Sequence, residues 1–201
     1  MRVKTEAKRQ HIVDVAAQTF RELRFEGASM AEICARVGGS KATLYNYFAS
    51  KEELLFEVMT QSCEAEFDAA HRAIDVKTDD IGAALQHFGE RFLGALYSPE
   101  MQANRHLAIS SSGRTDLGRL MYERGVQQSQ ALVAEVLSSA MQQGKLRSAD
   151  PKVATQQLYA LLEAELIDRF LFQLLGKITA KEIRAVTGRA IAVFMAAYRP
   201  L

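Results

Sequence analysis

The sequence has 201 residues, of which 48% are hydrophobic and 24% charged, and its formal net charge is +1 at pH 7. This composition excludes collagen-like, disordered and disulfide-scaffold proteins, and the length suits one large domain or two small ones. The chain holds only 3 Pro and 12 Gly, and because strands need more turns than long helices do, we expect an all-α fold. The near-zero net charge neither indicates nor excludes a nucleic-acid partner.

Two cysteines and the lack of long apolar runs indicate where the protein works. Cys34 and Cys63 have no companion at metal-ligand spacing, so we interpret them as reduced thiols. The sequence holds no run of 18 or more apolar residues, and its first residues, which include Arg2 and Lys4, lack the apolar segment of a signal peptide. We therefore expect a cytoplasmic protein that is not attached to a membrane.

Helix start and stop signals are closely spaced in the first quarter of the chain. Residues 5–25 carry apolar side chains at intervals of three and four, which predicts an amphipathic helix ended by Gly27. Short helices are predicted over residues 30–37 and 41–48, and a longer one from residue 51 to about residue 73. Each of these three begins after a serine whose hydroxyl can cap backbone N–H groups: Ser29, Ser40 and Ser50.

Two short helices joined by a glycine-containing turn, with a longer helix on each side, are typical of a helix-turn-helix module. In the second short helix, Leu44 and Phe48 lie one turn apart and therefore share a face, which we predict to be buried. Residues 1–51 carry nine Lys and Arg against five Asp and Glu, a net charge of +4, whereas the remaining residues carry −3. This asymmetry favours contact with phosphate.

The rest of the chain predicts a helical body, which brings the total to about nine helices. The last two carry apolar residues on more than one face, and burying both faces favours a four-helix interface between two subunits. Helix caps and glycine stops place the helices of the body at approximately residues 80–97, 99–110, 116–143, 151–175 and 180–198.

The residues from Ser29 to Leu54 resemble the DNA-binding head of the tetracycline-repressor (TetR) family. The resemblance is most specific in Ser-Lys-Ala-Thr-Leu-Tyr-Asn-Tyr-Phe followed by Ser-Lys-Glu-Glu-Leu. Residues 121–125, 144–146 and 150–151 are similar to the regulatory domain of the AefR and AcrR-like branch. The resemblance implies an all-α fold with an N-terminal helix-turn-helix head and a helical regulatory body.

The resemblance also implies a dimeric, ligand-responsive transcriptional regulator, in general a repressor, that binds a near-palindromic operator in double-stranded DNA. Residues 1–52 would form the DNA-binding domain, and residues 53–201 would bind an unidentified small-molecule inducer and form the homodimer through the last two long helices. The chain departs from the family at Gly39, because members usually carry an apolar residue after the turn glycine. We therefore expect a looser head before DNA binding.

By this resemblance, Lys41, Ala42 and Thr43 would face base edges in the major groove. Lysine suits guanine O6 or N7, whereas alanine and the threonine methyl suit the thymine methyl. Phosphate contacts, which position the helix without reading sequence, would come from Ser29, Ser40, Tyr45, Asn46, Tyr47 and Lys51. Taken singly, these residues would be surface charges, packing groups or helix caps, and their spacing within a complete motif favours the DNA-binding role.

The helical body of this family usually encloses an inducer cavity. The candidates for lining it are Phe88, Phe92, His106, Tyr122 and Glu163. The alternative interpretation is structural: core positions for the aromatic side chains, and mutual pairing or exposure for the polar ones.

We expect neither a catalytic site nor a cofactor or metal. The order of residues 38–43 does not match a phosphate-binding loop, and the histidines are isolated in the sequence, so they form no metal-ligand or acid–base motif. Two other functions stay open, namely a helical module for protein interaction or non-specific DNA binding, and an enzyme of the helical-bundle type.

Overall fold

The computed structural model describes residues 5–61, 63–74 and 80–200. Within these ranges the regular structure is helical, apart from an isolated bridge between Ser112 and Thr115, which confirms the all-α prediction. None of the helices described is both long and apolar enough to cross a bilayer. The chain forms two compact units, Met1–Ser62 with Ala108–Met121 and Cys63–Leu107 with Tyr122–Leu201.

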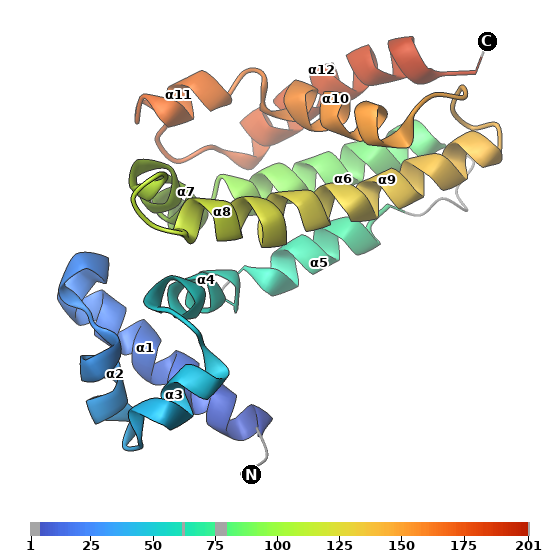
Figure 1. Ribbon diagram of the computed structural model, residues 1–201. Helices are drawn as coiled ribbons and strands as arrows, with labels where there is room; N and C mark the ends of the chain where they lie inside the picture. Colours follow the sequence, from blue (N-terminus) through green and yellow to red (C-terminus); the bar gives the residue numbers. More distant parts are fainter. Residues whose placement is uncertain (1–4, 62, 75–79, 201) are drawn as a thin grey trace. The chain divides into compact units, whose positions relative to one another are not determined.

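The first unit contains the predicted helix-turn-helix (Figure 1). Its helices are α1 (Glu6–Gly27), α2 (Met30–Val37), α3 (Lys41–Tyr47), α4 (Lys51–Gln61) and the short α8 (Leu117–Leu120). The serine caps form as predicted, and in each case the Oγ accepts a backbone N–H at 3.1 Å: Ser29 from Glu32, Ser40 from Thr43, and Ser50 from Glu53.

Apolar packing holds the helices of the first unit together. The helix α4 packs on α1 and on α8, so the unit that contains the head extends beyond residue 52. Its most buried side chains include Ile12, Ala16, Phe20, Ile33, Leu44, Phe48, Leu54 and Phe56. The helix α1 ends at Gly27 as predicted, and its regular geometry is interrupted at Arg24, whose φ is 58°. As predicted, the glycine turn ends α2, because Gly38 adopts a left-handed conformation with a φ of 68°.

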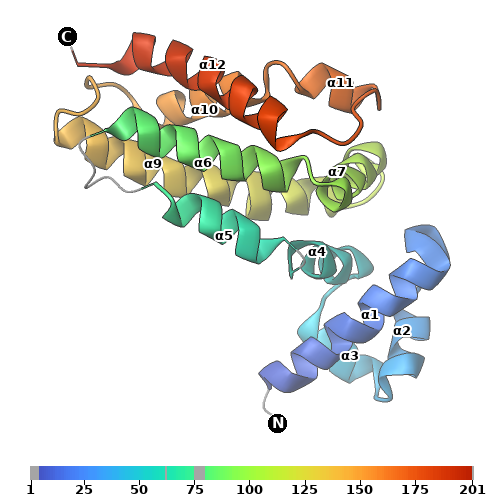
Figure 2. The same cartoon turned by 180° about the vertical axis from the view of Figure 1, so that it is seen from behind.

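The second unit is a layered helical bundle. Figures 1 and 2 show α6 and α9 between α5 on one side and α10 and α12 on the other. Its core includes Phe88, Leu137, Leu158, Phe170 and Phe194, each fully buried. The helices are α5 (Glu64–Arg72), α6 (Ile81–Leu96), α7 (Pro99–Ser111), the π-helical η1 (Met121–Val126), α9 (Gln127–Gln142), α10 (Pro151–Glu163), α11 (Ile167–Leu171) and α12 (Ala180–Tyr198). Of α7 only the part up to Leu107 belongs to this unit, and of η1 only the part from Tyr122.

The described residues form more helical segments than the nine expected, because several predicted helices are interrupted. The helix expected over residues 51–73 is divided into α4 and α5, and a π-helical turn interrupts the one expected over residues 116–143. The helix expected over residues 151–175 ends at Glu163. There the N–H of Leu166 bonds to the carbonyl of Glu163 at 2.9 Å, so the chain leaves the α-helical pattern and redirects Leu166 into the core.

Candidate DNA-binding and ligand-binding sites

The helix α3 separates an apolar face from a polar one. Leu44 and Phe48 are buried as predicted, and because they lie one turn apart they hold the helix against the unit from one side. Of the residues predicted to contact DNA, Thr43 and Tyr47 are half-buried, and the others on or next to α3 are exposed: Ser40, Lys41, Ala42, Tyr45 and Asn46. Ser29, the N-cap of α2 and also predicted to contact DNA, is exposed as well.

Lys51 is engaged within the unit. Its ammonium donates hydrogen bonds to the carbonyl oxygens of Phe25 at 2.7 Å and Ala28 at 3.0 Å, and it lies 4.1 Å from the centroid of the Phe25 ring. The last carbonyls of a helix have no partner within it, so a lysine that caps the end of α1 is stabilising. The lysine therefore braces α1 against α4, a role that its predicted phosphate contact did not anticipate.

Tyr47 is also tied to its own unit. Its hydroxyl oxygen accepts a hydrogen bond from the backbone N–H of Thr5, the N-cap of α1, at 2.9 Å. Two arginines are likewise engaged, since Arg9 pairs with Glu57 at 2.6 Å and Arg36 bonds to Glu32 at 2.7 Å. Several basic and polar groups of the first unit therefore orient its helices.

The five residues predicted to bind a ligand fall into separate places. Phe88 and Phe92 lie in the core, where their rings stack at 5.4 Å and Tyr159 meets Phe92 edge-on at 4.8 Å. Tyr122 is 55% exposed on η1. In this structure Phe88 and Phe92 are therefore core side chains. Periodicity in the sequence indicates that a side chain is buried, but it does not indicate which atoms cover it.

Glu163 and His106 belong to a polar cluster around Arg105. The Glu163 carboxylate accepts hydrogen bonds from the Tyr97 hydroxyl at 2.6 Å and from Arg105 Nη2 at 2.8 Å. The guanidinium lies 4.2 Å from the centroid of the Phe170 ring, on which His106 also stacks. Burial, and then the charge of Glu163, raise the pKa of Tyr97 well above its ordinary value, so this hydroxyl stays protonated and donates. Arg105 and Glu163 form an ion pair at 2.8 Å, whereas Nη1 of Arg105 is buried and has no hydrogen-bond partner among the residues that the structure describes.

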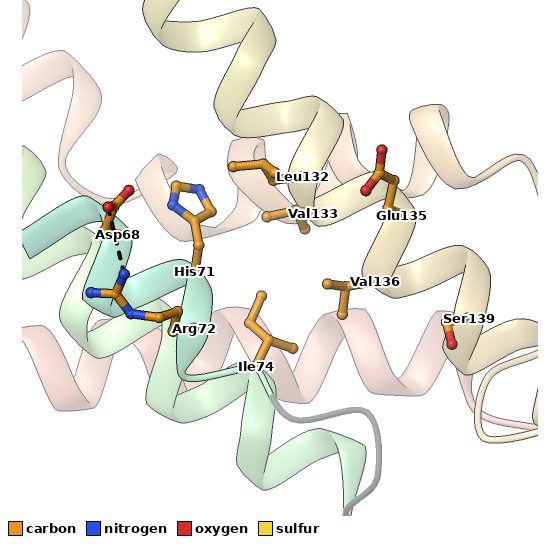
Figure 3. Close-up of a pocket in the computed structure, with 9 residues that line it drawn as sticks. All are labelled: Asp68, His71, Arg72, Ile74, Leu132, Val133, Glu135, Val136 and Ser139. Carbon is orange, nitrogen blue, oxygen red and sulfur yellow. Dashed lines mark ion pairs between the residues drawn. The ribbon is translucent and has the colours of Figure 1, made fainter. Parts of the chain in front are cut away.

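A groove with a cavity volume of about 470 Å³ lies between α5 and α9 (Figure 3). Its apolar part combines Ile74 with three residues of α9, and carboxylates stand at its edge. The lining residues are Asp68, His71, Arg72, Ile74, Leu132, Val133, Glu135, Val136 and Ser139. None of the five predicted ligand residues is among them.

A directed chain of hydrogen bonds links His71 to α9 and α10. The Nδ1 of His71 lies 2.7 Å from the carbonyl oxygen of Phe67, which can only accept, so Nδ1 carries the proton. In the neutral ring Nε2 therefore accepts, and its partner is the hydroxyl of Ser129 at 2.8 Å. The Ser129 oxygen in turn lies 2.7 Å from the Tyr159 hydroxyl, which donates to it. The chain is complete when His71 is neutral.

Stability should fall as His71 becomes protonated. Burial lowers the pKa of His71 below its ordinary value of 6.5, so the unfolded chain binds a proton more readily than the folded one does. The resulting contribution is fully present above pH 6.5 and is lost as the pH falls toward the folded-state pKa. We expect the free energy of unfolding to fall as the pH is lowered below about 6.5, and urea titrations of wild type and His71→Gln at a series of pH values should measure it. Equal pH slopes for the two proteins would contradict this role.

Sequence reasoning missed both the groove and this hydrogen-bond chain. The only local signal was the spacing of Phe67 and His71, which is compatible with any buried helix face. Ser129 and Tyr159 lie far from His71 in sequence. Among the residues that the structure describes, no three His, Cys, Asp or Glu side chains gather to hold a metal ion.

Comparisons with known proteins agree with this arrangement. Residues 12–58 match the family described as bacterial regulatory proteins, tetR family. Residues 83–200 match the family described as AefR-like transcriptional repressor, C-terminal domain. The HTH-type transcriptional regulator UidR of Escherichia coli strain K12 is 31% identical over an alignment of 127 residues, and the match covers 55% of this chain and 64% of UidR. The chain thus spans less than two thirds of that curated relative.

Two solved structures resemble the chain over nearly its full length. A TetR-family regulator from Mesorhizobium loti is 25% identical, with a TM-score of 0.80, and the match covers 98% of this chain and all of the other. The structure named flavonoid-responsive regulator FrrA is 29% identical, with a TM-score of 0.76, and the match covers 98% of this chain and 99% of FrrA.

Proposed function

The chain belongs to the TetR family of bacterial transcriptional regulators and carries an AefR-like C-terminal domain, and from this we propose that it binds a near-palindromic operator as a homodimer and releases it in response to a small-molecule ligand. It is a transcriptional regulator and not an enzyme. The observation that carries the operator-binding proposal is the polar, exposed face of α3 opposite the buried Leu44 and Phe48.

In the proposed complex, α3 lies in the major groove. Lys41, Ala42 and Thr43 stand at its N-terminal end, where helix-turn-helix proteins contact base edges. The exposed Tyr45 and Asn46 are suited to phosphates, which position the helix and add salt-dependent affinity. Ser29 and Ser40 are caps that can also approach phosphate, whereas Lys51 contributes mainly through its hold on α1.

The proposed homodimer uses α10 and α12, the last two long helices. These helices pack on each other, and each leaves a line of small or apolar side chains exposed, which favours close approach of a second pair of helices. The exposed residues are Val153, Ala160 and Ala164 at α10, and Ala185, Ala192, Val193 and Ala196 on α12.

The proposed ligand is a small aromatic molecule that carries hydroxyl groups, and its proposed site is the groove between α5 and α9. The groove volume falls within the range of small-molecule sites, about 300–1,000 Å³. Its apolar side chains suit an aromatic body, and carboxylates such as those of Glu135 and of Asp68, which also pairs with Arg72 at 3.5 Å, can accept hydrogen bonds from hydroxyls. The name of FrrA, which describes that protein as flavonoid-responsive, supports this chemistry.

None of the five ligand candidates from the sequence lines this groove, but Phe88 and Phe92 pack next to it. Phe88 packs behind His71, with ring centroids 5.9 Å apart, and Phe92 packs against Phe88. A ligand weakens operator binding only through its different affinity for the two arrangements of the dimer, a coupling of typically about 1–3 kcal/mol, or about five- to 150-fold in operator affinity.

Operator binding can be tested by fluorescence anisotropy. Labelled duplexes that flank the protein's own gene are titrated with the full chain at two salt concentrations, beside random-sequence duplexes of equal length. We expect the flanking DNA to bind at least about 10³-fold more tightly. Lys41→Ala should reduce this ratio, because it removes a base contact. Tyr45→Phe should weaken both duplexes alike, because it removes a phosphate contact. Equal affinity of the wild type for both duplexes would instead favour a non-specific DNA-binding module.

A further inference from the structure

Three large apolar side chains lie exposed within four residues at the end of α11. We call residues 171–174 the α11 turn. Leu171 is 47% exposed, Phe172 75% and Leu174 74%, and the last two values are the highest among the large hydrophobic side chains of the described residues. Single exposed apolar side chains are ordinary, whereas a contiguous group of them indicates an interaction surface.

Backbone hydrogen bonds hold the α11 turn in one conformation. The N–H of Gln173 bonds to the carbonyl oxygen of Phe170 at 2.9 Å, and the N–H of Leu174 bonds to that of Arg169 at 2.7 Å. This pair of bonds ends a helix when the residue between them is left-handed, and Gln173 has a φ of 56°. In such an ending the residue in the place of Leu174 frequently packs back on its own helix, whereas here it stays exposed. The bonds therefore present Phe172 and Leu174 outward.

The α11 turn adjoins the exposed face of α12. Figures 1 and 2 show α11 at one end of the pair formed by α10 and α12. There Nη1 of Arg169 bonds to the carboxylate of Glu182, in the first turn of α12, at 3.0 Å. At spacings of three and four from Glu182 follow exposed residues of α12: Ala185, Arg189, Ala192 and Ala196. Phe172 lies three positions after Arg169 and therefore on the same side of α11, so it extends this face.

The faces of α10 and α12 supply too little apolar area for a stable dimer by themselves. The proposed interface exposes five alanines and two valines, whose side chains cover at most about 330 Å² at about 30 Å² per carbon. A standard interface buries about 800 Å² per subunit, of which about 65% is apolar in homodimers. Phe172, three-quarters exposed, adds on the order of 150 Å². The α11 turn thus supplies the missing area and the large anchoring side chains.

We propose that the α11 turn docks on a second copy of this chain, with Phe172 and Leu174 as the anchoring side chains of the homodimer. A second copy is the partner because the turn extends the α12 face and completes the apolar area that this face lacks. In a two-fold dimer each subunit presents the same turn, so each anchor acts twice. The inference rests on the proposed function, which assigns α10 and α12 to the dimer.

Truncating the anchors should weaken the dimer. Phe172→Ala is expected to raise the dimer dissociation constant by about 10³-fold, because each subunit loses an anchor worth about 30-fold. Leu174→Ala should act in the same direction. Sedimentation velocity over a series of concentrations of the full chain measures the constant, and circular dichroism verifies that the helices remain. Tyr122→Ala is the matched control, because Tyr122 is an aromatic side chain of the same unit that is 55% exposed on η1.

The outcomes separate this inference from the proposed function. If the wild type is a dimer and the two anchor variants dissociate no more readily than Tyr122→Ala, the inference is overturned and the dimer through α10 and α12 stands. If the wild type sediments as a monomer at every concentration, the proposed homodimer fails as well.

Photo-crosslinking of the purified full chain identifies what covers the α11 turn. Benzoylphenylalanine is placed at Phe172, and the protein is mixed with isotope-labelled wild type before irradiation, so that mass spectrometry distinguishes crosslinks between chains from those within one. We expect a covalent dimer joined to peptides of the other chain. The same photoreactive residue at Tyr122 should give none. If position 172 crosslinks only within its own chain, or not at all when the protein is dimeric, the turn does not dock on a second copy and the inference is overturned.

Discussion

Replacing Gly89 with alanine should lower the melting temperature of the second unit, although alanine is the better helix former. A Cβ at this position of α6 would lie 2.6 Å from Cγ2 of Thr187 and 2.8 Å from Cδ2 of Leu162, so these two buried side chains of α12 and α10 would have to shift. Overpacking of this kind costs about 1–3 kcal/mol, and each kcal/mol corresponds to about 2–4 °C in a chain of this size. Differential scanning calorimetry measures the shift.

Gly94 provides the matched control for this prediction. It lies in the same helix, and no heavy atom of a neighbour comes within 4 Å of a Cβ built there. Gly94→Ala should therefore raise stability by up to about 1 kcal/mol, because alanine loses less backbone entropy on folding. Thr187→Ser, which removes the nearest methyl, should partly rescue Gly89→Ala. A shift of the same sign for both glycine variants would contradict the close approach of α6 and α12.

Introducing a charge at Val193 is expected to separate the proposed dimer and abolish tight operator binding. The side chain of Val193 is 55% exposed on α12, so Val193→Glu should leave the fold of each subunit intact. Two heads joined in one dimer gain about 10²–10⁴-fold in affinity over a single head, and the variant should lose this factor. Analytical ultracentrifugation measures the association, and anisotropy with the duplexes that flank the gene measures the affinity.

Ile109→Glu is the control for the dimer variant. Ile109 is exposed to a similar degree, 49%, but it lies on α7 rather than on α10 or α12. We expect this variant to sediment as a dimer and to bind the operator as the wild type does. If Val193→Glu also sediments as a dimer, the proposed interface through α12 is wrong.

The helices of the head were predictable because their signals are local. A serine caps the backbone three residues further on, and a glycine in the left-handed region ends a helix, whatever surrounds them. Leu44 and Phe48 were assigned to the buried face from a spacing of one turn. The same local rules failed near Glu163, where α10 ends although its helical pattern continues in the sequence.

The ligand candidates show the limit of periodicity. A repeating apolar pattern marks Phe88 and Phe92 as buried, but the atoms that bury them come from α5, α6 and α10. Lys51 shows the same limit, since its two carbonyl partners lie 23 and 26 positions away. Which side chains meet across helices depends on how the helices pack, and no short segment carries that information.

The amino-acid order alone therefore determined the helical class, the helix-turn-helix and the polar face of α3, since capping, turn formation and amphipathicity act over one or two turns of a helix. Tertiary packing alone decided the groove between α5 and α9, the chain from His71 through Ser129 to Tyr159, the bracing by Lys51 and the break after Glu163. These features come from segments brought together only when the apolar faces of the helices are buried against one another, and that burial outweighs local preference.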